Sequence, residues 1–476
     1  MTVEMVLYLL PMISVGATAL LLMLSAAIRR CSIVAFSISL LGLLCAFVLT
    51  FFNEIPQARV TDLFVIDNYG IFGMRLILLA TFVIVLFAFD YLKTKQEEVE
   101  EFYVLLMISC LGALCMVVSN HFMSFFLGLE ILTVPLYALI AYFHQRSNGL
   151  EAAIKYIVLA GVSAAFLLFG MVLIYAQLGN MRFDILADNW APMWNSGRLI
   201  LLLGLSFMMV GVFFKLSAVP FHMWAPDVYE GAPLPITAYL ATVSKGAMMV
   251  LFLRFYTQLH GDTVFAWQWL LSFIAILSMF IGNWLALLQK NIKRLLAYSS
   301  IAHVGYMLVA LLSGNDLGAS AVIFYLVTYF AATLLAFGAL MLLESNQNES
   351  VTIEDVRGLF YVKPALSGCL VLAFLSLVGI PLTAGFMGKY WILLAGVSQT
   401  KWPLLICLVV SSAIGLYAYL RVGVSLFQDQ APRAEFPKAP CGVLKITLAA
   451  LVVATLMLGI MPNSITTMIQ GAAGSL

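Results

Sequence analysis

The chain has 476 residues, of which 63% are hydrophobic and only 10% are charged, where soluble globular domains carry about 25% charged residues. The net charge of +1 provides no basic field for binding nucleic acid. Apolar runs of about 18 residues or more recur along the chain, and each could cross a bilayer. These features predict a polytopic membrane protein and exclude a disordered chain, a secreted disulfide scaffold and a soluble enzyme.

The apolar runs predict fourteen membrane-spanning segments in an all-α fold. Backbone inside lipid must satisfy its own hydrogen bonds, and the runs lack the alternation of barrel strands, so the segments are expected to be helices. They are expected at residues 5–28, 32–52, 71–89, 102–119, 122–143, 152–177, 199–224, 234–253, 264–289, 295–313, 321–343, 366–397, 403–420 and 443–461. The longest linking segments, expected at 53–70, 179–198, 344–365 and 421–442, are too short for a nucleotide-binding or iron–sulfur domain.

The distribution of Lys and Arg in the linking segments predicts the orientation, because cytoplasmic loops are enriched in these residues. An even number of spans places both termini on one side. Loops on the opposite side carry thirteen cations, which are Arg29, Arg30, Lys93, Lys95, Arg146, Lys290, Lys293, Arg294, Arg357, Lys363, Arg421, Arg433 and Lys438. Loops on the side of the termini carry four, which are Arg59, Arg182, Arg198 and Lys401. Both termini are therefore expected outside the cytoplasm.

Four charged residues lie deep inside expected spans, and they are the main functional signal. They are Glu130, Lys215, Lys245 and Lys389. A charge at the centre of a membrane helix costs about 2.5–3.5 kcal/mol on insertion scales, and such residues usually face a bundle interior or a wet cavity. One carboxylate cannot neutralise three lysines, and buried lysine exchanges protons readily. The set favours a proton relay over a purely structural ion pair.

Other cations in the spans are more ambiguous. Arg75, Arg254 and Lys445 lie at or near span ends, where they are expected to extend to the interface. Lys155 follows Glu151 by four residues, so it could be either a relay residue or one half of a helix-surface ion pair. His303, inside the tenth span, could carry protons near neutral pH or be a hydrogen-bonded core histidine.

Two spans contain a proline near one of the central lysines. Pro220 follows Lys215 by five residues, and Pro381 precedes Lys389 by eight. Proline removes a backbone donor, which a membrane helix tolerates where protein groups or water take up the freed carbonyl. Broken helices at matching positions in two halves are typical of inverted-repeat transporters and their ion sites. We therefore expect breaks in helices 7 and 12.

Three runs of residues resemble one known family, the antiporter-like membrane subunits of bacterial respiratory complex I (NADH:quinone oxidoreductase). They are NIKRLLAYSSIAHVGY at 291–306, KLSAVPFHMWAPDVYEGAP at 215–233 and LEIL at 129–132. Within the family, DVYEGAP at 227–233, LEAAIKY at 150–156 and Lys389 are most similar to the branch called subunit N. The related subunit M has glutamate where this chain has Lys389, and subunit L carries a long lateral helix after its last spans.

The resemblance implies two inverted five-helix repeats with flanking helices. The expected units are residues 1–101 (helices 1–3), 102–260 (helices 4–8), 261–428 (helices 9–13) and 429–476 (helix 14). It further implies that Glu130 and Lys215 form the pair of a first half-channel, that Lys245 is the central relay and that Lys389 is the exit-side carrier.

The resemblance also implies where redox chemistry takes place. The chain itself is expected to bind no cofactor or metal, whereas NADH, flavin, iron–sulfur clusters and quinone are expected in partner subunits. These partners would include a neighbouring antiporter-like subunit. The expected location is a bacterial inner membrane with both termini periplasmic, and the expected activity is proton pumping coupled to quinone reduction.

Three other functions are compatible with the sequence. A subunit of a multisubunit cation/proton antiporter shares the signature runs, and neighbouring genes for exchanger subunits would identify it. A membrane-bound hydrogenase or formate-oxidising complex would differ in its electron donor. If the chain is only a structural scaffold of the membrane arm, proton pumping should remain intact when Lys215 or Lys389 is replaced by alanine.

Overall fold

The structure, a computed structural model, describes residues 3–52, 58–95, 99–143, 147–259, 265–344, 351–429 and 442–476. Its helices are α1 (Val3–Ile28), α2 (Ser32–Leu49), α3 (Asn68–Lys95), α4 (Glu100–Val117), α5 (Phe122–Ile140), α6 (Ser147–Leu178), α7 (Phe183–Leu216), α8 (Trp224–Gly231), α9 (Leu234–Tyr239), the π-helix η1 (Leu240–Ser244), α10 (Lys245–Gln258), α11 (Phe265–Leu288), α12 (Ile292–Leu311), α13 (Asp316–Met341), α14 (Leu359–Val362), α15 (Pro364–Val378), α16 (Ala384–Ser398), α17 (Trp402–Leu426), α18 (Gly442–Ile460) and α19 (Asn463–Ala473). Two short strands, β1 (Ala58–Arg59) and β2 (Val65–Ile66), pair antiparallel.

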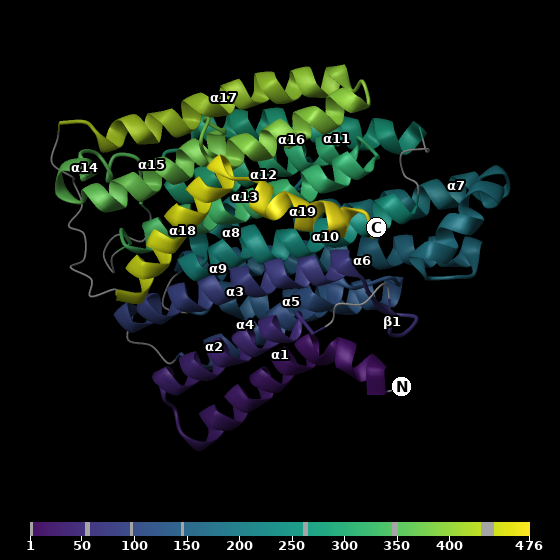
Figure 1. Ribbon diagram of the computed structural model, residues 1–476, viewed down its shortest axis with the longest axis horizontal. Helices are drawn as coiled ribbons and strands as arrows, with labels where there is room; N and C mark the ends of the chain where they lie inside the picture. Colours follow the sequence, from purple (N-terminus) through teal and green to yellow (C-terminus); the bar gives the residue numbers. More distant parts are fainter. Residues whose placement is uncertain are drawn as a thin grey trace.

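The architecture confirms the predicted all-α polytopic fold. Within the described residues, thirteen helical segments are long and apolar enough to cross a membrane, and α9, η1 and α10 form one of them. The expected twelfth span is instead divided into α15 and α16, each of 15 residues. Figure 1 shows most helices running across the bundle in similar directions, with both chain ends toward the same end of the molecule.

Both predicted breaks are present, although their boundaries differ from the expectation. Helix α7 ends at Leu216 and does not continue to Trp224, because Ser217 adopts a left-handed conformation with φ of 60°. Pro220 lies in the turns that follow. The second break separates α15 from α16 and contains Pro381, between Gly379 (φ 87°) and Leu382 (φ 74°).

The start of α7 also corrects the sequence-based boundaries. The segment 179–198 was expected to be a loop, yet the helix begins at Phe183. Asp184 lies in the first turn, where a negative charge is favourable, and it forms a 2.8 Å ion pair with Arg182. The charged residues at 182 and 184 thus favour a helix start well before the apolar run that crosses the membrane.

Among the cations used to predict orientation, Arg146, Arg433 and Lys438 lie outside the described residues.

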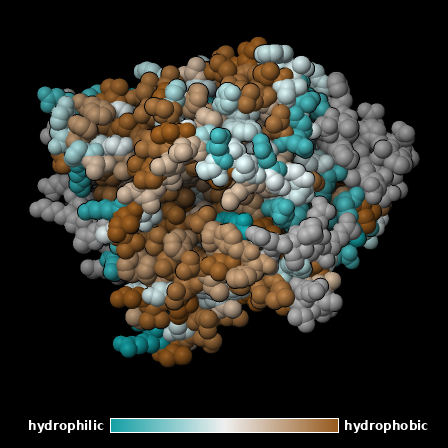
Figure 2. Space-filling model, viewed as in Figure 1, coloured by the Kyte–Doolittle hydropathy of each residue, from teal (hydrophilic) through white to brown (hydrophobic). Residues whose placement is uncertain are grey.

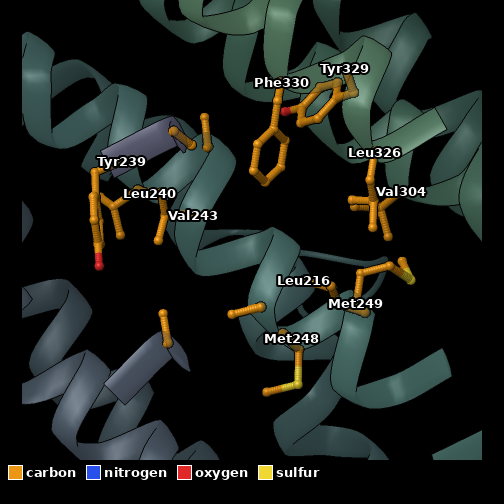
Figure 3. Close-up of a cluster of buried hydrophobic side chains, with 14 of the residues drawn as sticks. Leu216, Tyr239, Leu240, Val243, Met248, Met249, Val304, Leu326, Tyr329 and Phe330 are labelled. Atoms are coloured by element: carbon orange, nitrogen blue, oxygen red, sulfur yellow. The ribbon is translucent and has the colours of Figure 1, made fainter. Parts of the chain in front are cut away.

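The centre of the bundle is formed by α9, η1, α10, α12 and α13, whose residues are almost all buried. Figure 3 shows part of this core, to which η1 contributes Leu240 and Val243, α10 contributes Met248 and Met249, and α13 contributes Leu326 and Phe330. The outer helices expose large apolar side chains, as membrane-facing helices do, and Figure 2 shows hydrophobic residues over much of one face. The central helices therefore hold any polar groups away from lipid.

Close packing of α4 against α5 provides a first prediction. A Cβ atom at Gly112 would lie 2.2 Å from the backbone nitrogen of Leu132 and 2.7 Å from the carbonyl oxygen of Gly128. The helices must separate to accept it, so Gly112→Ala should lower the free energy of unfolding by about 1–3 kcal/mol. The thermal unfolding midpoint of the detergent-solubilised protein measures this. Gly161→Ala in α6, where nothing lies within 4 Å, is the matched control and should change it little.

A buried ion pair joins α10 to the segment before α3, and it overturns one expectation. Arg254 was expected to extend to the membrane interface, but it is 1% exposed and donates to both carboxylate oxygens of Asp67 at 2.7 and 2.8 Å. The backbone N–H of Gly70 donates to the same carboxylate at 2.6 Å. Arg75, also expected to extend outward, donates to the hydroxyl and carbonyl oxygens of Thr50.

Candidate proton pathway

Lys215 lies in the last turn of α7, directly before the first break. It is 2% exposed. Its Nζ donates to Thr133 Oγ1 of α5 at 2.6 Å and to the hydroxyl of Tyr156 of α6 at 3.0 Å. The indole of Trp224 donates to the Phe214 carbonyl at 2.8 Å and so takes up an acceptor at the helix end. The break therefore places a cation among hydroxyl groups in an apolar interior.

Glu130 of α5 lies near Lys215, but the two side chains form no direct ion pair. The two side chains line one small cavity of about 10 Å³, roughly the space that the centre of one water molecule needs. Among the described residues no direct ion pair joins them, since Lys215 binds the hydroxyls of Thr133 and Tyr156 instead. The geometry allows a water-mediated contact that could form and break without large movement.

Lys245 follows the π-helix η1 and begins α10. It is 2% exposed, and its Nζ donates to Ser300 Oγ of α12 at 2.7 Å. It also lies 5.5 Å from the ring centre of Tyr229, whose hydroxyl is buried. Single π-turns are frequent at functional sites. Lys245 stands out in the sequence as a central charge, but no pattern in the sequence indicates the π-helix.

Aromatic side chains connect the surroundings of Lys215 with those of Lys245. The ring centres of Tyr156 and Trp224 are 4.9 Å apart, and those of Trp224 and Tyr229 are 6.5 Å apart. The first ring carries the hydroxyl bound by Lys215, and the last lies beside Lys245. The two lysines thus share one aromatic wall.

His303 lies one turn of α12 beyond Ser300 and is 3% exposed. Its Nδ1 lies 2.6 Å from the hydroxyl of Tyr325, and its Nε2 lies 3.5 Å from the hydroxyl of Tyr419. The Tyr419 hydroxyl also bonds to Ser299. Both ring nitrogens therefore have hydroxyl neighbours. This arrangement fits either role of His303, as a hydrogen-bonded core histidine or as a proton carrier.

Lys389 of α16 faces the second break. It is half-buried, and its Nζ donates to the Val378 carbonyl oxygen at 2.5 Å and to Ser412 Oγ at 2.7 Å. That carbonyl belongs to the last residue of α15, so the ammonium lies at the negative end of a helix dipole. The Nζ also lies 4.9 Å from the ring centre of Tyr306, the next turn of α12 after His303.

Lys155 has a different environment from the three central lysines. Its side chain is 43% exposed and pairs with Glu151 and Asp227 at 2.8 Å each. Arg294 pairs with Asp227 at 2.9 Å and with Glu230 at 2.8 Å. Burial would raise the pKa of the Asp227 carboxyl, but hydrogen bonds from Lys155 and Arg294 outweigh it and hold that pKa below its usual range.

These charged groups line an open polar cavity of about 260 Å³. Ala152 forms part of its lining, and Tyr156, the partner of Lys215, lies one helical turn further along α6. The structure therefore places Lys155 at the surface end of α6 and brings it close to the buried site without making it part of the central row.

The structure also contains a buried charged pair that the sequence does not predict. Lys293 is one of the predicted loop cations, and Glu344 lies in a predicted linking segment. Their side chains are 2% and 0% exposed, with Nζ and Oε1 3.8 Å apart. The hydroxyl of Tyr91 donates to Glu344 Oε2 at 3.1 Å. Lys293 lies in the 291–306 run, but a position beside a helix end gave no sign of burial.

The chain is similar in sequence and in fold to known membrane proteins. A family model described as NADH:quinone oxidoreductase/Mrp antiporter, TM, matches residues 119–415. NADH-quinone oxidoreductase subunit N of Methylococcus capsulatus (strain ATCC 33009 / NCIMB 11132 / Bath) is 41% identical over 468 residues, covering 97% of this chain and 94% of the relative. A chain in the structure of respiratory complex I from Thermus thermophilus with bound aureothin is 32% identical, with a TM-score of 0.83 over 96% of this chain and 98% of that one.

Two more distant structures share the fold. A chain of the membrane-bound sulfane sulfur reductase, an archaeal respiratory membrane complex, is 24% identical with a TM-score of 0.87, covering 99% of this chain and 97% of that one. A chain of the Mrp complex from Dietzia sp. DQ12-45-1b is 19% identical with a TM-score of 0.87, covering 100% and 98%. At these identities the likeness concerns architecture alone. The chain belongs to the NADH:quinone oxidoreductase/Mrp antiporter family of membrane proteins and, within it, to the subunit N family of NADH-quinone oxidoreductases.

Proposed function

We propose that this chain is a proton-translocating membrane-arm subunit of a NADH-quinone oxidoreductase, with Glu130, Lys215, Lys245 and Lys389 as its relay. His303 extends the relay between the last two lysines. One observation carries the proposal: in the described structure, the three lysines donate to hydroxyl or carbonyl oxygens, and no carboxylate forms a direct ion pair with any of them. Lysine held only by neutral oxygens can exist with or without its proton.

The energies involved are small enough for hydrogen-bond rearrangements to drive the transfer. Moving one proton against 100 mV requires about 2.3 kcal/mol. A hydrogen bond to a charged group contributes about 1.5–3 kcal/mol. Exchange of one oxygen partner of a lysine, or entry of Glu130 into direct contact with Lys215, would therefore suffice to move a proton along the row.

The two breaks support the proposed division into repeats at 102–260 and 261–428. Each break follows a helix end near a lysine, Lys215 in the first repeat and Lys389 in the second. Non-helical backbone at membrane depth is tolerated where protein or water covers it. Met223 is 72% exposed and Leu382 is 69% exposed in the isolated chain. We infer that neighbouring membrane subunits, including another antiporter-like subunit, cover these breaks.

Redox chemistry is assigned to other subunits of the complex. NADH, flavin, iron–sulfur clusters and quinone would be bound there, and the conformational or electrostatic change they produce would reach this chain through its neighbours. With both termini on the periplasmic side of a bacterial inner membrane, the charged cavity around Lys155 and Asp227 would face the cytoplasm. Protons would then enter near Lys215.

Inverted membrane vesicles carrying Lys215→Ala test the proposal. We expect the complex to assemble on a native gel, while NADH-driven quinone reduction and vesicle acidification both fall by about ten-fold or more, in the range of a lost acid–base group. Lys93→Ala, which removes an exposed lysine stacked on Phe89, is the control and should behave as the native chain does. Native rates in the Lys215→Ala vesicles would mean that the chain is a scaffold.

A further inference from the structure

A buried asparagine of the second repeat lies next to the surroundings of Lys389. Asn283 is in the last turns of α11 and is 2% exposed. Its amide nitrogen Nδ2 donates to the hydroxyl of Tyr306 of α12 at 2.8 Å. The same nitrogen donates to the hydroxyl and carbonyl oxygens of Ser411 of α17 at 2.7 and 3.0 Å. One amide group therefore connects three helices.

The partners of the amide fix its orientation. The Ser411 carbonyl oxygen can only accept a hydrogen bond, so it faces the amide nitrogen of Asn283 and not the amide oxygen. The amide nitrogen is only a donor, so the Tyr306 oxygen accepts from it and the phenol directs its own O–H elsewhere. Ser411 Oγ, at 3.4 Å from the phenol oxygen, already accepts from Asn283 and donates to the Met279 carbonyl oxygen at 3.0 Å.

This arrangement determines which face of α17 meets Lys389. Ser411 and Ser412 are consecutive, so their side chains point about 100° apart around the helix axis. Ser411 faces Asn283, whereas Ser412 Oγ accepts a hydrogen bond from Lys389 Nζ at 2.7 Å. The Tyr306 hydroxyl also interacts with Ser412, and the ring centre of Tyr306 lies 4.9 Å from Lys389 Nζ. Asn283 therefore holds both the helix and the ring that lie beside Lys389.

Gly415 of α17 provides the space that the amide needs. It follows Ser411 by four residues, so it lies on the same helix face. A Cβ atom at Gly415 would lie 2.5 Å from Asn283 Oδ1 and 3.0 Å from its Cγ. An added methyl group would therefore displace the amide group of Asn283 from its present position.

We propose that Asn283 is a positioning residue of the proton pathway, which orients Tyr306 and Ser412 so that Lys389 can lose and regain its proton; this inference rests on the proposed function. Protonated Lys389 donates to the Ser412 oxygen. Neutral Lys389 has a lone pair instead, and the Ser412 hydroxyl turns to donate to it. The Tyr306 O–H then donates to the Ser412 oxygen, because the Asn283 amide prevents the phenol from donating toward α11. The proton itself arrives and leaves along the row, and Asn283 neither holds nor transfers it.

The test measures NADH-driven pumping by the whole complex in inverted vesicles, normalised to the amount of complex on a native gel. Asn283→Leu removes the amide at similar volume and should slow pumping about five-fold, the change in rate that corresponds to one hydrogen bond. Gly415→Ala keeps every polar group but displaces the amide, so it should also slow pumping. Gly423→Ala in the same helix, where nothing lies within 4 Å, is the matched control and should pump at the native rate.

Ser412→Ala separates a positioning role from a role in stability alone. It removes the oxygen through which Asn283 acts on Lys389, so the double variant of Asn283→Leu with Ser412→Ala should pump no more slowly than Ser412→Ala by itself. A role in stability alone predicts less assembled complex but native pumping per complex, and that result would overturn the proposal. Two losses that simply multiply in the double variant would overturn it as well. Gly415→Ala with Ser412→Ala provides the same comparison if leucine at position 283 prevents assembly.

Lys389→Met in parallel distinguishes failure of this inference from failure of the proposed function. If Lys389→Met stops pumping while Asn283→Leu and Gly415→Ala pump at the native rate, only the positioning role of Asn283 is wrong. If Lys389→Met itself pumps at the native rate, Lys389 is not part of a relay, and both proposals fail.

Discussion

Lys245→Met should reduce NADH-driven proton pumping by about ten-fold or more, while the complex still assembles. Lys245 donates a hydrogen bond to Ser300, and its Nζ lies 5.5 Å from the ring centre of Tyr229. Methionine fills similar space without a proton to exchange, and it leaves no buried charge unpaired, so the packing of α10 against α7 and α4 should persist. Acidification and quinone reduction in inverted vesicles, normalised to the amount of complex on a native gel, measure the effect.

Lys245→Arg separates proton transfer from simple electrostatics. Arginine keeps the positive charge but does not release its proton in proteins. A relay role predicts that the arginine variant pumps as poorly as the methionine variant, whereas a role in charge alone predicts recovery. Lys290→Met, which removes an exposed lysine before α12, is the control and should leave the rate at its native value. Recovery of pumping by arginine would exclude Lys245 as a proton carrier.

Arg254→Met should be the most destabilising of the substitutions considered, by about 3–5 kcal/mol, because it leaves the carboxylate of Asp67 buried without its cation. The native pair has two direct hydrogen bonds, and both side chains are at most 3% exposed. The pair ties α10, in the centre of the bundle, to the segment that begins α3. We expect less assembled complex in membranes and a lower thermal midpoint for the purified complex.

Two further variants show whether the loss of stability in Arg254→Met comes from the uncompensated charge of Asp67. The double variant Arg254→Met with Asp67→Leu removes both charges and should recover most of the midpoint. Asp62→Asn disrupts the exposed pair with Arg182 and should cost less than about 1 kcal/mol. If Arg254→Met alone leaves the midpoint unchanged, the buried pair does not hold these helices together.

The candidate site was predictable in its residue types but not in its contacts. Lys215, Lys245 and Lys389 stand out because a cation inside an apolar run is costly, and that cost is local to the run. Their partners lie on other helices: Thr133 and Tyr156 for the first, and Ser300 for the second. No local pattern identifies a serine or a tyrosine as the oxygen that a distant lysine will bind.

The wrongly predicted helix boundaries also reflect contacts between residues that a local sequence pattern does not show. The apolar run after 199 predicted where α7 crosses the membrane, yet the helix begins at Phe183 and ends at Leu216. Its end depends on a left-handed Ser217 and on the indole of Trp224, which binds a carbonyl of the last turn. Hydropathy measures transfer into lipid and carries no information about such side-chain contacts.

By itself the sequence determined the all-α membrane fold, the two breaks and the row of central charges. Each of these follows from the cost of placing a polar group or a free carbonyl in lipid, and this cost depends only on neighbouring residues. Only the tertiary structure decided that Arg254 is buried against Asp67, that Lys293 and Glu344 are enclosed together, and that Glu130 meets Lys215 across a small cavity. Burial of a charge near a helix end depends on which helices pack around it, and that packing brings together residues far apart in the chain.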